Sequence, residues 1–408
     1  MQKNQNSWPA LLLASPHRLL FLTGVAQMMM MILWWLFALM DTYTGTGTGA
    51  GILIQTDLPP GILHGQIMLF LLLPPFLFGF LLTVFPRWMG YDDFSVRLFS
   101  PVGIAFALSG FSVTVGIWSG NTPMIRAAFV LGMIGWAYAL ILLAGTILRN
   151  WRDSKPVCWH AISAWVALTF GLVGAGGTAY FLFTGDGQLI PIVARMGTFA
   201  FMVPLFATVM HRMLPFFASM VVADYVRWRP DWLLLALWIL LLLYLGADLA
   251  QNIPMLAGTS LTLAALFFVM LAKWMPRALA PGLLWALVVG VAWQPIAFLL
   301  LSAQAMGFAL GRAPLHALYV GFACSLLIAM VTRVTYGHSG RSLSMPAVGW
   351  VALIGIQIAA ALRIAAGVMG ESGYILIAAA AILAIALCPW TIHCAYIYVT
   401  RRRDGKAG

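Results

Sequence analysis

The chain has 408 residues, of which 62% are hydrophobic and 8% charged, with a formal net charge of +11. Its mean hydropathy is +0.96. Soluble globular chains are roughly 45–50% apolar and about a quarter charged, so this composition excludes a soluble enzyme, a disordered scaffold and a nucleic-acid binder. We therefore expect an all-α membrane protein surrounded by membrane lipid, whose basic residues mark cytoplasmic loops.

Apolar runs long enough to cross a bilayer recur along the whole chain. A membrane helix takes about 20 apolar residues, so a chain of this length allows about twelve spans and leaves no room for a large soluble domain. We expect one polytopic transmembrane domain over residues 1–408. The expected spans are 19–40, 62–85, 100–119, 124–148, 158–183, 191–220, 232–250, 255–273, 282–306, 314–336, 347–369 and 374–400.

Basic residues are distributed unevenly between the two sides of this layout. Of the 22 Lys and Arg, 17 fall on the side that also holds both termini. The five exceptions are Arg126, Arg195, Arg212, Arg312 and Arg363. Since Lys and Arg are enriched in cytoplasmic loops, both termini are predicted to be cytoplasmic. Arg363 lies close to Glu371, which predicts an ion pair near the outer face.

The histidines are the most informative residues, because the spans sort them by depth. His64 lies at the start of the second expected span and His316 at the start of the tenth, both about one turn inside the outer face. His338 follows His316 by 22 residues, which is roughly 33 Å along a helix, so these two cannot share a site. We therefore predict that His64 and His316 meet, on helices that run in the same direction.

Two facing imidazoles in a nearly uncharged leaflet fit a haem iron best. Neutral imidazole is a good axial ligand, and a flat porphyrin can be buried between helices. A copper ion is the second alternative, although copper usually takes three or four ligands. The third is a structural histidine that is hydrogen-bonded at a helix mouth. Arg195, just inside the outer face, is the candidate partner for haem propionates.

The second, sixth and tenth spans show a weak internal similarity. They are separated by four helices each and run in the same direction, and the sixth carries Arg195 where the other two carry histidine. This pattern suggests three units of four helices around a centre. Pro74, Pro75 and Pro204 are expected to break the second and sixth helices at mid-depth, which would free backbone carbonyls there.

A second cluster of histidines is expected at the cytoplasmic end. The segment 337–341, GHSGR, presents His338 together with a hydroxyl and a guanidinium. It could bind an anion or a metal ion with His211 or His393. A capped helix end is the alternative interpretation.

Three stretches of the sequence match the patterns of one family. Segment 63–70, LHGQIMLF, looks like W-H-x-H-E-M-x-F, and segment 211–217, HRMLPFF, looks like G-R-x-I-P-x-F. Segment 315–318, LHAL, and segment 330–341, MVTRVTYGHSGR, are similar to H-A-L and M-x-T-R-V-x-x-G-H-T-G-R. The chain therefore resembles NnrS, a bacterial membrane protein with haem and copper that is linked to nitric oxide metabolism.

The resemblance implies a haem held by His64 and His316, similar to the low-spin haem of haem-copper oxidase subunit I, which is held from the second and tenth helices. The chain departs from the family at Gln66, Ile67 and His211, which stand where the family has His, Glu and Gly. Gln is a poor ligand of transition metals and Ile is none, so the copper site is not favoured. Gln66 stays a candidate cofactor contact.

The resemblance further implies a function in the bacterial inner membrane. The expected protein holds haem b, responds to nitrosative stress, and either binds or reduces nitric oxide or transfers electrons from a quinol. Whether it is an enzyme stays open at this point. Two alternatives are a membrane transporter and a non-catalytic assembly subunit that has lost its second metal site.

Overall fold

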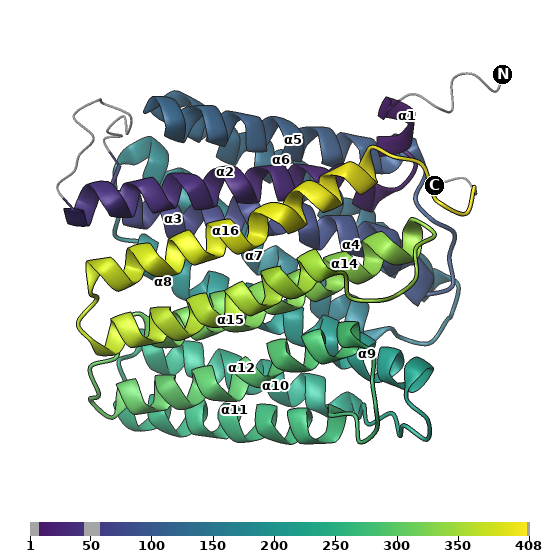
Figure 1. Cartoon of the computed structure of the whole chain (residues 1–408). Helices are drawn as coiled ribbons and strands as arrows, with labels where there is room; N and C mark the ends of the chain where they lie inside the picture. The colour runs from purple at the N-terminus through teal and green to yellow at the C-terminus, as the bar shows by residue number, and fades with distance from the viewer. Residues whose placement is uncertain (1–7, 45–57, 406–408) are drawn as a thin grey trace. The chain divides into compact units, whose positions relative to one another are not determined.

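The computed structural model describes residues 8–44 and 58–405 of the chain. Within these two ranges every regular element is a helix and no β-strand occurs (Figure 1). Twelve of the described helices are long and apolar enough to cross a membrane. The expected all-α fold with about twelve membrane helices is therefore confirmed.

Several of these spans consist of more than one helical element, because the helix type changes within them. In chain order the elements are α1 (Trp8–Leu12), α2 (Pro16–Thr44), α3 (Pro60–Ile67), η2 (Met68–Leu72), α4 (Leu73–Trp88), α5 (Val96–Ser119), α6 (Thr122–Arg152), α7 (Trp159–Thr184), α8 (Ile190–Met196), η3 (Gly197–Met202), α9 (Val203–Val221), α10 (Asp231–Leu249), α11 (Ile253–Trp274), α12 (Gly282–Ala305), α13 (Ala313–His316), η4 (Ala317–Cys324), α14 (Ser325–His338), α15 (Ala347–Val368) and α16 (Gly373–Tyr398).

The chain divides into two compact units. Unit 1 comprises Met1–Gly197, Val334–Ser342 and Thr391–Gly408, and unit 2 comprises Thr198–Arg333 and Leu343–Trp390. The sequence suggested three units of four helices, and that division has no counterpart in this grouping.

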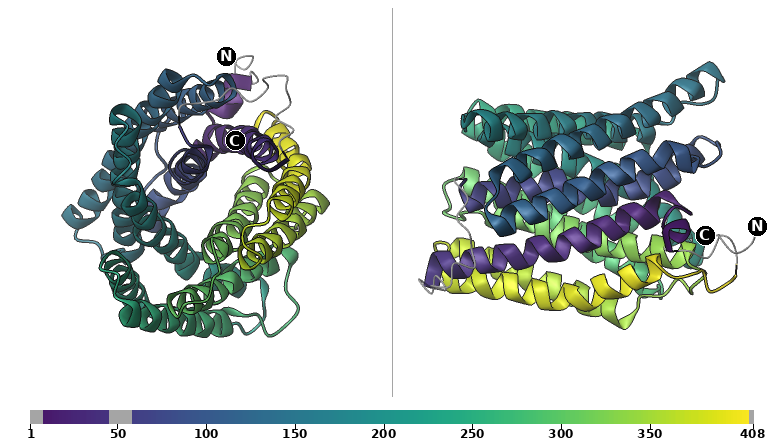
Figure 2. Two further views of the ribbon diagram at one scale, coloured as in Figure 1. Left: turned by 90° about the vertical axis from the view of Figure 1, so that its left-hand side faces the viewer. Right: turned by 90° about the horizontal axis from the view of Figure 1, so that it is seen from above.

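In unit 1 the helices pack in sequence order around η2. Helix α2 packs against α4 and α5, α5 packs against α6, and α6 packs against α7. Helices α5 and α6 lie side by side in both Figure 1 and Figure 2. Glycines allow close approach to η2, because a Cβ atom at Gly174 of α7 would lie 2.5 Å from the ring of Phe70. At Gly197 it would lie 2.7 Å from the same ring.

In unit 2 a chain of hydrogen bonds lies beside η4. Helices α12 and α15 both pack against η4, and the Trp293 ring of α12 covers Gly321, where only hydrogen fits. Trp293 Nε1 donates to Gln357 Oε1 over 2.6 Å, and Gln357 Nε2 donates to Ser325 Oγ over 2.8 Å. These bonds satisfy polar groups that would otherwise be costly in an apolar environment.

Three of the spanning helices contain a π-helical segment. The segments η2, η3 and η4 lie in the second, sixth and tenth spans, which are the three that the sequence relates to one another. In these spans 78%, 78% and 72% of the most apolar window is buried, against at most 61% in the other nine. Since π-helical segments occur frequently at functional sites, the three spans are the best candidates for holding one.

The prolines of the second and sixth spans do not break their helices, so that expectation is wrong. Pro74 and Pro75 lie in the first turn of α4, directly after η2, and Pro204 lies in the first turn of α9, directly after η3. A proline lacks the N–H that would bond a carbonyl four residues earlier. The N–H of Leu73 bonds to the carbonyl of Met68, five residues earlier. This change of helix type keeps the second span continuous.

Arg18 forms hydrogen bonds with both ends of the described chain in unit 1. Its side chain is almost fully buried, and its guanidinium donates to the backbone carbonyls of Leu11, Ile397 and Thr400. Leu11 lies in α1, Ile397 lies in the last turn of α16 and Thr400 follows that helix, so the guanidinium adds charge-assisted hydrogen bonds where these segments end. The start of α2 and the end of α16 meet at this point (Figure 2).

Replacing Arg18 by Leu is expected to lower the free energy of unfolding by about 2–4 kcal/mol, because it removes the three hydrogen bonds of a buried charged group. The measurement is the thermal unfolding of the purified protein in detergent. Arg401→Leu is the matched control, since Arg401 is exposed, and it is expected to change the stability by less than about 0.5 kcal/mol. Equal melting temperatures for both variants would contradict this role of Arg18.

Candidate functional site

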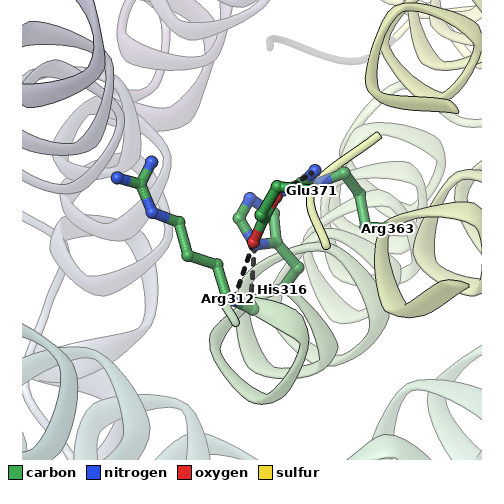
Figure 3. Close-up of polar contacts among 4 residues, drawn as sticks. All are labelled: Arg312, His316, Arg363 and Glu371. Atoms are coloured by element: carbon green, nitrogen blue, oxygen red, sulfur yellow. Dashed lines mark hydrogen bonds and ion pairs between the residues drawn. The ribbon is translucent and has the colours of Figure 1, made fainter. Parts of the chain in front are cut away.

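The hydrogen bonds of His316, in unit 2, indicate which of its ring nitrogens carries the proton. Its Nδ1 lies 2.9 Å from the carbonyl oxygen of Arg312 and 3.3 Å from Nη2 of Arg363 (Figure 3). A carbonyl only accepts hydrogen bonds and a guanidinium only donates them, so Nδ1 can bond to one of the two at a time. The shorter contact indicates that Nδ1–H donates to the carbonyl. The lone pair of Nε2 is then available, which is the form in which imidazole binds a metal ion.

Glu371 contacts both neighbours of this imidazole. Its Oε1 accepts a hydrogen bond from the backbone N–H of Arg312 over 2.9 Å, and its Oε2 lies 3.5 Å from Nη1 of Arg363. The predicted ion pair between Arg363 and Glu371 is therefore confirmed. The two side chains are 13% and 31% exposed, so solvent screens this pair less than an ion pair on the surface.

His64 lies in α3 of unit 1 and stacks on an aromatic ring. The ring centroids of His64 and Trp35 are 3.9 Å apart and the rings are inclined by 12°. This contact with α2 fixes the plane of the imidazole. Sequence reasoning missed Trp35, because the sequence gives no sign of which face of α2 lies against α3.

The other two residues predicted beside His64 also lie in unit 1. Gln66 is buried, and its Oε1 accepts a hydrogen bond from Thr178 Oγ1 of α7 over 2.8 Å. Arg195 is half-buried on α8, which packs against α3, the helix that carries His64. Gln66 thus has a structural partner within the protein, and Arg195 belongs to an element that contacts the helix of the predicted ligand.

The two predicted haem ligands each lie shortly before a π-helical segment. η2 begins at Met68, four residues after His64, and η4 begins at Ala317, directly after His316. In the sixth span η3 begins at Gly197, two residues after Arg195. His64 belongs to unit 1 and His316 to unit 2, and their pairing stays a prediction.

The histidines predicted for a second site have different neighbours. The ring of His338 lies 4.6 Å, centroid to centroid, from that of His17, which is buried. His211 is fully buried in unit 2, with its Nε2 3.2 Å from the carbonyl of Pro230 and its ring edge-to-face with Trp274. A signal for His17 was present in the sequence, because it begins the first span on the side where the tenth span ends.

Two further polar contacts lie near His338 in unit 1. Tyr336 OH lies 2.9 Å from Nε2 of His393, so this histidine has a partner on α14. Arg87 donates two hydrogen bonds to the carboxylate of Asp93, over 2.7 and 2.6 Å. These bonds hold the pKa of Asp93 below its usual value. The carboxylate therefore stays ionised and balances one of the arginine charges at this end of unit 1.

In residues 8–44 and 58–405 no three His, Cys, Asp or Glu side chains gather closely enough to hold a metal ion. A copper centre with three or four such ligands therefore gains no support from this part of the chain. A haem iron needs only two protein ligands. The hydrogen-bonded form of His316, with Nε2 unprotonated, fits that requirement, and the second span offers the half-buried His64 shortly before its own π-helical segment.

Comparison with sequence families gives one match, in which the model of the NnrS protein family covers residues 11–402. The chain belongs to the NnrS family. A comparison with curated proteins gives no match. NnrS membership and a membrane bundle of helices fit a nitric-oxide-related membrane protein, and the family is generally associated with haem and metal. The family match includes every residue of the candidate site.

The contact between Gln66 and Thr178 in this NnrS family member can be tested by a double-mutant cycle. Gln66→Leu and Thr178→Val are each expected to lower the free energy of unfolding by about 1 kcal/mol, since each removes one partner of a buried hydrogen bond. The double variant is expected to lose less than the sum, because the two residues share this bond. Thermal unfolding in detergent measures all three changes.

The same variants separate a structural role of Gln66 from a role in binding a cofactor. If Gln66 contacts a cofactor, Gln66→Leu lowers the haem content of the purified protein and Thr178→Val does not. Additive losses of stability in the double variant would show that the bond is not formed.

Proposed function

We propose that this NnrS family member is a haem protein of the bacterial inner membrane that acts in nitric oxide metabolism. His64 and His316 are its two axial ligands, and the haem is of the non-covalent b type. Both termini face the cytoplasm, because most Lys and Arg lie on their side of the membrane.

The observation that carries this proposal is the placement of the two histidines relative to the π-helical segments. In the second and tenth spans an imidazole stands within one turn of a π-helical segment, near the start of a deeply buried membrane helix. An ionisable group in such a position costs free energy, so it is by default a functional candidate. Two histidines, each near the start of its span, supply the number and type of ligands that haem b requires.

The hydrogen bonding of His316 supports the same assignment. Donation of Nδ1–H to the Arg312 carbonyl leaves Nε2 as the ligand atom and makes it more basic. At His64, stacking on Trp35 holds the ring in one plane. Each of these contacts orients its imidazole before a ligand binds, which lowers the entropic cost of binding.

Arg195 is the proposed partner of the haem propionates. A guanidinium binds a carboxylate through two parallel hydrogen bonds, and Arg195 occupies the place in the sixth span that histidines occupy in the other two. Its helix α8 contacts α3, the helix of His64.

When bound, a haem with two histidine ligands supplies one-electron transfer, and it binds gas only after it loses one ligand. We propose that this protein accepts electrons from a quinol and either transfers them to another protein or reduces nitric oxide with them. The residues of the chain would bind and orient the group.

The test is the absorption spectrum of the full-length protein purified in detergent. The wild type is expected to show a Soret band and the spectrum of a low-spin haem b. His64→Ala and His316→Ala are each expected to lose most of the haem or to convert it to a five-coordinate form, because one axial ligand is missing.

His393→Ala is the matched control. His393 of α16 contacts Tyr336, which lies at the opposite end of the tenth span from His316. Its spectrum is expected to match the wild type. A wild-type protein without a Soret band, or an unaltered band in both ligand variants, would overturn the proposal.

A further inference from the structure

We propose that Glu371 and Arg363 are positioning residues that decide which ring nitrogen of His316 carries the proton, and hence which nitrogen is free to bind iron. The consequence for iron binding rests on the proposed function. The tautomer of His316 itself can be measured in the protein without haem. In this cluster the imidazole meets the backbone carbonyl of Arg312 and the guanidinium of Arg363, and Glu371 contacts both of these residues (Figure 3).

Two groups compete for Nδ1 of His316. The Arg312 carbonyl, at 2.9 Å, can only accept a hydrogen bond from it, and the Arg363 guanidinium, at 3.3 Å, can only donate one to it. With the carbonyl as partner, the proton is on Nδ1 and the lone pair is on Nε2. With the guanidinium as partner, the proton moves to Nε2, which then cannot bind iron. The ring is neutral in both forms.

Glu371 acts on both competitors through its two oxygen atoms. Oε2 lies 3.5 Å from Nη1 of Arg363 while Nη2 of the same guanidinium lies 3.3 Å from Nδ1, so the carboxylate holds one side of the guanidinium and limits how closely the other side approaches the ring. Oε1 accepts from the backbone N–H of Arg312, the residue whose carbonyl bonds to Nδ1. One carboxylate therefore restrains the competing donor and fixes the residue that supplies the competing acceptor.

The backbone around Glu371 has unusual conformations and close approaches that let its carboxylate reach Arg312. Glu371 has a φ of +61° and Gly311 a φ of +52°, and the left-handed region costs a residue with a side chain free energy. A Cβ atom on Gly311 would lie 2.7 Å from Oε1 of Glu371. At Gly367 it would lie 2.5 Å from the carbonyl of Leu310. Small residues and a strained backbone thus allow Glu371 to reach the start of α13.

The consequence is a way to release one axial ligand without unfolding a helix. If Arg363 left Glu371 and donated to Nδ1, a water molecule would have to take the proton from Nδ1 and return one to Nε2, and Nε2 would then have no lone pair for a metal ion. A haem held in this way would have one position open to a gas such as nitric oxide. Arg363 and Glu371 would then set the balance between electron transfer and gas binding.

The test is nitrogen NMR of the full chain labelled with ¹⁵N-histidine, prepared without haem in lipid nanodiscs. Protonated and unprotonated ring nitrogens differ widely in chemical shift, and His316→Gln assigns the signal. The wild type is expected to carry the proton on Nδ1. In Glu371→Gln the ratio of the two forms is expected to shift by about tenfold toward Nε2–H, because the released guanidinium gains a hydrogen bond.

Two further variants separate positioning from a general change of structure. The double variant Glu371→Gln/Arg363→Gln is expected to return the proton to Nδ1, since the competing donor is gone. Asp248→Asn makes the same acid-to-amide change at the end of α10 in the same unit, and it is expected to leave the His316 signal unchanged. If Glu371→Gln does not fold, Glu371→Asp replaces it, because its shorter side chain draws the carboxylate away from Arg363.

A wild type with the proton on Nε2, or a folded Glu371 variant with the wild-type ratio, overturns the inference. Failure of the proposed function gives a different result, since a chain that never binds haem still reports the form of His316. Where haem binds, Glu371→Gln is expected to show a smaller six-coordinate fraction than the wild type. An equal fraction in both proteins overturns the inference as well.

Discussion

The structure depends on one constraint, which is that the hydrocarbon core of a membrane offers no water to bond with backbone N–H and C=O groups. Each group must be satisfied within the protein, so every described regular element is a helix. The same constraint acts where helices are disturbed. Near Pro74 and Pro75 the second span stays hydrogen-bonded because it changes to a π-helical segment. The buried guanidinium of Arg18 likewise satisfies carbonyls at helix ends.

These adjustments coincide with the residues that carry chemistry. The second, sixth and tenth spans are the most deeply buried and each contains a π-helical segment, close to His64, Arg195 or His316. An extra residue in a helical turn changes the direction of the side chains before it relative to those after it. Because His64, Arg195 and His316 lie shortly before η2, η3 and η4, these segments set how the three polar side chains are oriented relative to the rest of their spans.

Much of the fold was predictable, because long apolar runs and the positions of Lys and Arg are local properties of the sequence. The number of spans and the ion pair of Arg363 with Glu371 followed from them. The effect of the prolines was predicted wrongly, since a π-helical segment depends on which neighbours surround the helix. The contacts of His64 with Trp35 and of His338 with His17 join residues that are far apart in the sequence, and no local pattern encodes them.

The sequence by itself determined the all-α fold, the family and the number of helices that can cross a membrane. These depend on composition and on spacing along one helix, where each residue adds a fixed rise. Only the tertiary structure decided the hydrogen-bonded form of His316, because its ring meets a carbonyl of its own helix and a guanidinium from α15 at once. The choice between these partners depends on distances of a few tenths of an ångström across two helices, which packing alone sets.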